Sequence, residues 1–146
     1  MKIYFKVDFI IYEIGSDAFL NAFFSTVAYH LEDKQRGTRF PVFFNKLYRG
    51  KVEYQDISDL SEELKTIKKE LKKYMPNEII WDIDNLAATP PWGNNISPDI
   101  TDLSNYFVTS DGRDLFDVMF QALKDADSEK LDLTIEAIKK FPMGML

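Results

Sequence analysis

A long segment without regular hydrophobic spacing separates two short apolar runs in the second half of the chain. The runs are residues 79–81 and 106–109, and each has the length and composition of a buried strand. The 22 residues between them, 84–105, are rich in Pro, Gly, Asn and Ser. Loops of this length in a compact domain are usually either functional or disordered. A tryptophan and few charges in its first half argue against disorder, so we predict a functional loop.

Amphipathic patterns on both sides of this loop predict three helices and a strand. Residues 2–12 alternate as a half-buried strand, with Ile3, Phe5, Val7, Phe9 and Ile11 on the buried face. Gly15 ends this strand, and Ser16 is the predicted N-cap of the first helix. The buried stripe of that helix comprises Leu20, Phe23, Phe24, Val27 and Leu31.

The second and third helices are predicted from their cap signals and their apolar spacing. Residues 59–74 form the second helix, which opens with the capping-box pair Asp59 and Glu62. Ser110 or Asp111 caps a third helix that extends to about Ala126. We interpret the second helix's lysines as a solvated face rather than a phosphate site; they are Lys68, Lys69, Lys72 and Lys73.

Three shorter segments complete the predicted fold. Residues 39–48 favour a short helix over a strand, and residues 51–54 suggest a short edge strand. Residues 130–138 fit either a strand or a helix, and the clean alternation of their leucines and isoleucines favours the strand. We therefore predict one α+β domain over residues 1–146, with a small, mainly antiparallel sheet packed against about three helices and a long loop containing Pro, Gly and Asn.

The composition excludes several kinds of catalytic site. The chain has no cysteine and a single histidine, so thiolate catalysis, Ser-His-Asp triads and Cys/His zinc sites are excluded. We interpret His30, which lies near the apolar stripe of the first helix, as structural. No glycine-rich loop that would hold a phosphate is present.

Clustered carboxylates leave one catalytic alternative open. Four or five of these carboxylates together would suit the coordination of a magnesium ion, as in a small metal-dependent hydrolase. They are Asp82, Asp84, Asp99, Asp102, Asp111 and Asp114. Acidic residues also gather at turns and helix caps for purely local reasons, and we favour that explanation, with no metal and no cofactor.

The charge of the chain is unevenly distributed. The net charge is −6, and residues 76–146 alone contain thirteen acidic and five basic groups. This acidity argues against direct nucleic-acid binding and suits a basic protein partner, although solubility alone also explains it. The apolar run in residues 1–15 is too short and too charged for a membrane span, so we expect a cytoplasmic protein with no membrane partner.

The segment Pro90-Pro91-Trp92-Gly93 is the sharpest local feature of the loop. Two prolines stiffen the backbone, and Gly93 permits a turn directly after the tryptophan. A Trp on such a turn is suited to anchor a protein interface. The alternative is that Trp92 fills the edge of the core and fixes the loop.

Five stretches together resemble the immunity protein 70 family of bacterial polymorphic toxin systems. They are FKVDFIIYEIGS (5–16), TRFPVFFNKLYRG (38–50), IIWDIDNL (79–86), PPWGNNIS (90–97) and LSNYFVTSDGRDLF (103–116). The resemblance implies a small cytoplasmic α+β protein that takes part in bacterial competition. Such a protein binds and neutralises the C-terminal toxin domain of a cognate secreted toxin, for which a nuclease is the expected activity, and it is no enzyme.

The resemblance supplies neither catalytic residues nor mapped contacts, so the candidate toxin-binding residues come from the loop and the turn that follows it. They are Trp92, Gly93, Asn94, Asp99, Asp102, Asp111, Arg113 and Asp114. A general protein-interaction adaptor stays open as a further alternative. The oligomeric state is not predicted.

Overall fold

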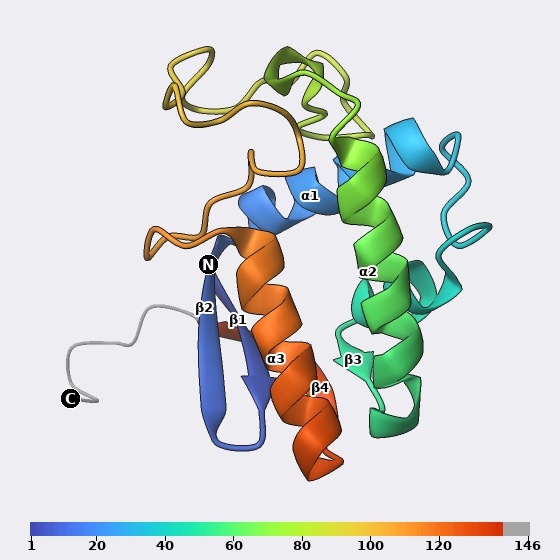
Figure 1. The fold of residues 1–146 in the computed structure, drawn as a ribbon. Coiled ribbons are helices and arrows are strands. Elements are labelled where there is room, and N and C mark those ends of the chain that lie inside the picture. Colours follow the sequence, from blue (N-terminus) through green and yellow to red (C-terminus); the bar gives the residue numbers. More distant parts are fainter. Residues whose placement is uncertain (139–146) are drawn as a thin grey trace.

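Four strands form one antiparallel sheet in the computed structural model, which describes residues 1–138 (Figure 1). The strands are β1 (Lys2–Val7), β2 (Ile10–Ser16), β3 (Lys51–Val52) and β4 (Leu133–Ile138), in the order β2-β1-β4-β3. The sheet and its helices confirm the predicted α+β class. The short β3 lies at one edge of the sheet, as predicted for residues 51–54, and β4 confirms the strand favoured for residues 130–138.

The predicted strand over residues 2–12 is in fact a hairpin. Strands β1 and β2 pair antiparallel through Val7 and Ile10, and Asp8 adopts the left-handed backbone conformation (φ 53°) in the turn between them. Val7 and Ile10 are directly opposite and therefore face the same side of the sheet. The buried side chains are odd-numbered in β1 and even-numbered in β2. Phe9 and Ile11 are therefore exposed rather than buried, and Phe9 exposes 90% of its surface.

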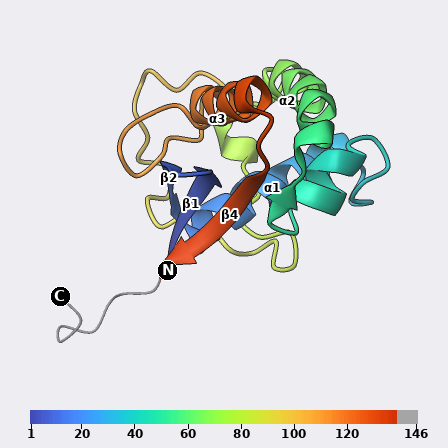
Figure 2. The same cartoon turned by 90° about the horizontal axis from the view of Figure 1, so that it is seen from below.

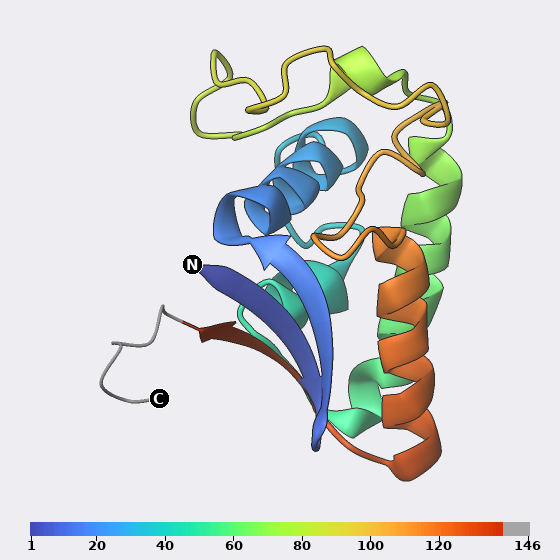
Figure 3. The ribbon, with the colours of Figure 1, turned by 90° about the vertical axis from the view of Figure 1, so that its left-hand side faces the viewer.

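Three fifteen-residue helices pack on one side of this sheet. They are α1 (Asp17–Leu31), α2 (Ile57–Leu71) and α3 (Leu115–Glu129). Helices α2 and α3 lie side by side, and α1 crosses behind them near one end of the sheet (Figures 2 and 3). Short helical turns occur at η1 (Phe43–Leu47), η2 (Tyr54–Asp56) and η3 (Pro76–Glu78). Helical turn η1 confirms the helix favoured within residues 39–48.

The core of the domain is built around Phe23 of α1. Its ring contacts Phe24, Phe43, Phe107 and Phe116, with ring centroids 5.1–5.9 Å apart. Three of these contacts are edge-to-face, the arrangement that the aromatic quadrupole favours. The predicted stripe of α1 is confirmed, since all five of its residues are buried. Phe23 thus joins α1, η1, α3 and the end of the long loop.

One of the predicted helix N-caps is confirmed and another is wrong. Ser16 caps α1 as predicted, because its Oγ accepts a hydrogen bond from the Phe19 N–H at 3.0 Å. The capping box at Asp59 is wrong. Helical turn η2 leads straight into α2, so the helix begins at Ile57 and Asp59 already lies in its first turn.

The predicted start of α3 at Ser110 or Asp111 is also wrong. Gly112 has a φ of 85°, a left-handed conformation that interrupts a right-handed helix. The helix begins at Leu115 instead, and the Asp114 carboxylate accepts the Asp117 N–H at 3.1 Å. Gly15 does not end β2 either, because the strand continues through Gly15 to Ser16 beside an irregularity in the β1–β2 register.

Candidate functional site

Two hydroxyl groups of α1 hold the start of the long loop. Ser25 and Thr26 are buried, and Thr26 Oγ1 both accepts the Ile80 N–H and donates to the Ile80 carbonyl, each at 3.2 Å. Ser25 Oγ accepts the Ile83 N–H at 3.1 Å. The strand predicted at residues 79–81 is therefore wrong. These side chains satisfy backbone groups that a neighbouring strand would otherwise pair.

The far end of the loop is held by β2 and by the core. The strand predicted at residues 106–109 is wrong, since only a single bridge joins Val108 to Asp114. Directly after it, the Ser110 N–H donates to the Ile14 carbonyl of β2 at 3.0 Å. Phe107 is nevertheless buried against Phe23, so the run is apolar because it enters the core.

A chain of aromatic rings connects the core to the surface of the loop. Phe107 contacts Tyr106 edge-to-face, with centroids 5.3 Å apart. The Tyr106 hydroxyl accepts the Trp92 indole N–H at 2.9 Å, and Trp92 meets Trp81 edge-to-face at 5.4 Å. Trp92 still exposes 39% of its surface. Trp92 therefore fixes the loop, as one of the two sequence interpretations has it, while part of its side chain stays exposed to solvent.

The turn around Trp92 has the predicted form. The Gly93 N–H donates to the Pro90 carbonyl at 3.0 Å, and Gly93 takes a left-handed φ of 56° with open space on its Cβ side. Gly93 and Asn94 are both exposed. The three predicted residues at positions 92–94 therefore lie together at the surface.

Asp99 and Asp102 belong to a turn that is fixed by its own side chains. The Asn105 amide oxygen accepts the N–H groups of Thr101 and Asp102, while its NH₂ group donates to the Asp99 carbonyl. The Asp102 carboxylate accepts the Ser104 N–H at 2.8 Å. These hydrogen bonds fix the turn with which the long loop ends.

The remaining predicted residues lie on the following turn, next to β2. Asp111 accepts hydrogen bonds from Thr109 and from Arg113 Nε, the latter at 3.2 Å. Asp114 is half-buried at the start of α3, and burial raises the pKa of its carboxyl. The structure therefore divides the eight predicted residues among three successive turns rather than gathering them into one cluster.

An apolar hollow beside Trp92 was not anticipated from the sequence. It has a volume of about 320 Å³ and lies between the loop and the start of α1. Its apolar lining consists of Phe19, Trp92, Ile96, Ile100, Tyr106 and Val108. The spacing of Ile96 and Ile100 was the only local signal, and Phe19 comes from a distant part of the chain.

A known protein family matches most of the chain. The family model described as Immunity protein 70 matches residues 5–135, which include both sheet edges and the whole loop. The chain belongs to the immunity protein 70 family. No curated protein and no solved structure matches the chain. As a member of this family it is an immunity protein of toxin systems. The family resemblance inferred from the sequence is confirmed.

The carboxylates of this immunity protein are engaged separately. The Asp99 carboxylate accepts from the Ser97 hydroxyl at 3.5 Å, Asp102 serves the same turn, Asp111 the next, and Asp114 caps α3. Across residues 1–138, no three His, Cys, Asp or Glu side chains are placed to hold a metal ion. The magnesium cluster considered from sequence is therefore not formed. His30 accordingly has a structural environment, with Nε2 at 2.7 Å from the Glu78 carbonyl and its ring against Tyr74.

The segment of this immunity protein that contains the long loop carries charge of one sign. Residues 76–112 contain six acidic residues and no lysine, arginine or histidine.

None of the helices within residues 1–138 combines the length and the apolar character needed to span a bilayer.

We expect replacing Asp102 with Asn to make stability less dependent on pH. Burial acts to raise the pKa of Asp102, but hydrogen bonds from Ser104 and Thr101 outweigh it and hold that pKa below its usual value. A carboxyl with a lowered folded-state pKa adds stability above its unfolded pKa of about 3.9, and that stability is lost as pH falls through the folded value. Thermal unfolding at pH 6 and at pH 3 measures this. A wild-type protein and an Asp102→Asn variant with the same pH dependence would contradict it.

Proposed function

We propose that this immunity protein binds the C-terminal toxin domain of a cognate secreted polymorphic toxin and blocks it by occlusion. The observation that carries the proposal is the anchored loop, in which Trp92 borders an apolar hollow of about 320 Å³. Inhibition by occlusion needs a rigid complementary surface and no chemistry. A partly exposed tryptophan beside a pocket is the usual form of an interface anchor.

The charge of the loop indicates the kind of partner. With six carboxylates and no cation, the segment 76–112 that contains the loop favours a basic surface. Nuclease domains hold phosphates with cationic residues, and an acidic inhibitor can occupy the same groove. A nuclease is thus the toxin activity we propose, and the cytoplasm of the producing cell is the place where its inhibition protects that cell.

The loop residues divide into contact and support roles under this proposal. Trp92, Gly93 and Asn94 are exposed and supply the central contact, while Asp99 supplies charge at its rim. Asp102 and Asp114 are partly buried and hold their turns in place. Asp111 and Arg113 pair with each other on the neighbouring turn and contact the partner only if it also covers β2.

The test is inhibition of the toxin domain encoded beside the immunity gene. We expect an equimolar amount of this protein to abolish the nuclease activity of the purified domain, with a 1:1 complex in size-exclusion chromatography. A toxin domain from an unrelated system is the matched control and should stay active. Full toxin activity at a tenfold excess of the protein would refute the proposal and favour an adaptor with another partner.

A further inference from the structure

A groove between α2 and α3 is bordered by four lysines. Lys65, Lys68, Lys69 and Lys72 of α2, together with Phe120 of α3, surround a volume of about 390 Å³. Their spacing of three, four and seven residues places the lysines on one flank of α2. The sequence alone favours a solvated helix face for such a run. The structure adds the second wall of the groove and a half-buried aromatic ring within it.

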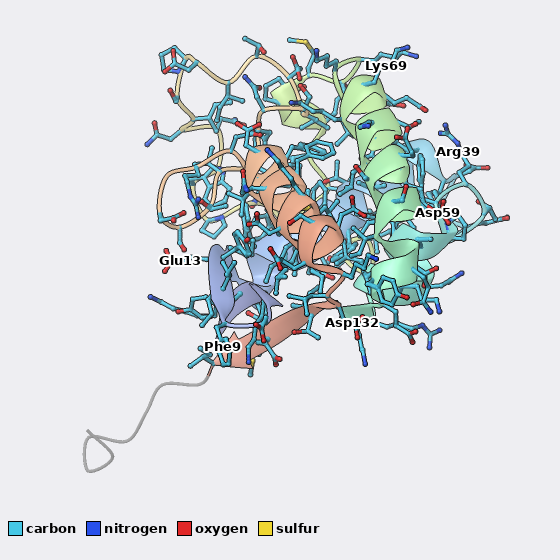
Figure 4. All side chains as sticks on the ribbon, turned by 60° about the horizontal axis from the view of Figure 1, so that its bottom comes forward. Phe9, Glu13, Arg39, Asp59, Lys69 and Asp132 are labelled. Atoms are coloured by element: carbon cyan, nitrogen blue, oxygen red, sulfur yellow. The ribbon has the colours of Figure 1, made fainter. Side chains whose placement is uncertain are left out.

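Two carboxylates of α2, Glu63 and Glu70, bind groups away from these lysines. Glu63 accepts the N–H groups of Val42 and Phe43 at 3.1 and 2.9 Å. Glu70 accepts Arg39 Nη1 at 2.9 Å. Arg39 lies on the side of α2 away from α3 (Figure 4). Helix α2 therefore keeps these carboxylates on one flank and its lysines on the flank that faces α3.

Three of the four lysines have no direct counter-charge within the described part of the chain. Lys65 pairs with Glu62 at 3.0 Å, whereas Lys68, Lys69 and Lys72 form no ion pair among residues 1–138. Asp114 and Asp102 interact with Lys68 and Lys72 only at longer range. Like charges at these spacings repel, which opposes the favourable effect of the helix dipole on Lys68 and Lys69 in the last turn of α2.

We propose that this groove binds an acidic segment of the same toxin domain. Carboxylates of the segment would pair with Lys68, Lys69 and Lys72, and an apolar side chain would cover Phe120. The inference rests on the proposed function, because the groove adjoins the loop. The Leu103 N–H of the loop donates to the Tyr74 carbonyl just beyond α2 at 3.0 Å. One partner can therefore cover the acidic loop and the lysine groove together.

The surroundings of the groove favour a peptide segment over a nucleic acid. The groove continues along the two helices into a space of about 240 Å³, where two carboxylates, Glu62 and Asp127, stand beside two lysines, Lys65 and Lys124. The chain as a whole carries a net charge of −6. A long polyanion that followed the groove would meet these carboxylates, whereas a short acidic segment would contact only the lysines.

Two double variants with the same loss of charge test the groove. We expect Lys68→Gln/Lys72→Gln to weaken toxin-domain binding about fivefold, since exposed charge pairs contribute modestly. The control Lys46→Gln/Lys51→Gln removes two lysines near η1 and β3, which pair only weakly with Asp56 and Asp132 at 3.9 and 3.8 Å. It should change binding less than twofold. Equal effects of the two double variants would overturn the inference.

Titrating the free protein with an acidic peptide tests the groove independently of the proposed function. In NMR spectra of the free protein, a hexaglutamate peptide should shift the amide signals of residues 65–72 and of Phe120, and the groove variant should lose these shifts. If the toxin domain does not bind at all, the proposed function fails while this titration still decides the groove. No shift with hexaglutamate, or tighter binding of a single-stranded DNA 12-mer than of the peptide, overturns it.

Discussion

Replacing Trp92 with alanine should weaken binding of the toxin domain by about 2 kcal/mol or more, roughly thirtyfold in Kd. The side chain borders the hollow and is partly exposed, which is why we propose it as the central contact with the partner. The free energy of unfolding should fall by about 2 kcal/mol. This is less than the roughly 3–5 kcal/mol typical of a fully buried aromatic residue, because 39% of Trp92 is already exposed. Calorimetric binding and denaturant unfolding measure the two effects separately.

The conservative variant Trp92→Phe is the control for this experiment. It keeps an aromatic ring against Trp81 but removes the indole N–H that bonds to Tyr106. Most of the binding should therefore persist, with a loss of about 1 kcal/mol of stability for the missing hydrogen bond. A Trp92→Ala protein that is strongly destabilised but still binds normally would place the interface elsewhere. The acidic face of α3 would then be the next surface to test.

Replacing Phe23 with alanine should cost about 3–5 kcal/mol of folding free energy, the range for a large aromatic removed from a close-packed core. Phe23 is fully buried and its ring contacts four other phenylalanines, so the cavity would be lined by side chains from four elements. Urea unfolding monitored by circular dichroism measures the loss.

The hairpin offers a matched comparison. Phe9→Ala removes the same side chain from a position that is 90% exposed, and stability should change by less than about 0.5 kcal/mol. A Phe23→Ala loss below about 1 kcal/mol would contradict the arrangement of the core. A comparable loss for Phe9→Ala would show that the hairpin tip is covered.

The helices were predictable because their signals are local. The stripe of α1 repeats every three to four residues, and each of its members is buried. Ser16 likewise acts on an N–H only three residues away. The hairpin was missed because Ile3, Phe5, Val7, Phe9 and Ile11 keep one alternating period although Ile10 interrupts it, and the left-handed turn falls on Asp8 without the Asn-Gly signal typical of such turns.

The contacts of the loop could not be predicted from local sequence patterns. Residues 79–81 have the composition of a strand, but the backbone of Ile80 bonds to the hydroxyl of Thr26 in α1, 54 residues earlier in the chain. Trp92 was identified because Pro90, Pro91 and Gly93 surround it in sequence. The hollow beside it was not, because one wall comes from Phe19. A pocket formed by segments distant in the chain leaves no pattern in either segment.

The aromatic chain of the loop also has an optical consequence. The protein contains only two tryptophans, Trp81 and Trp92, and their rings meet edge-to-face in the loop. Tryptophan emission therefore originates entirely in this segment, whereas far-ultraviolet circular dichroism is dominated by the three helices. Comparing the two signals during denaturation distinguishes release of the loop from unfolding of the domain. Excitation selective for tryptophan likewise reports events at the loop without any attached dye.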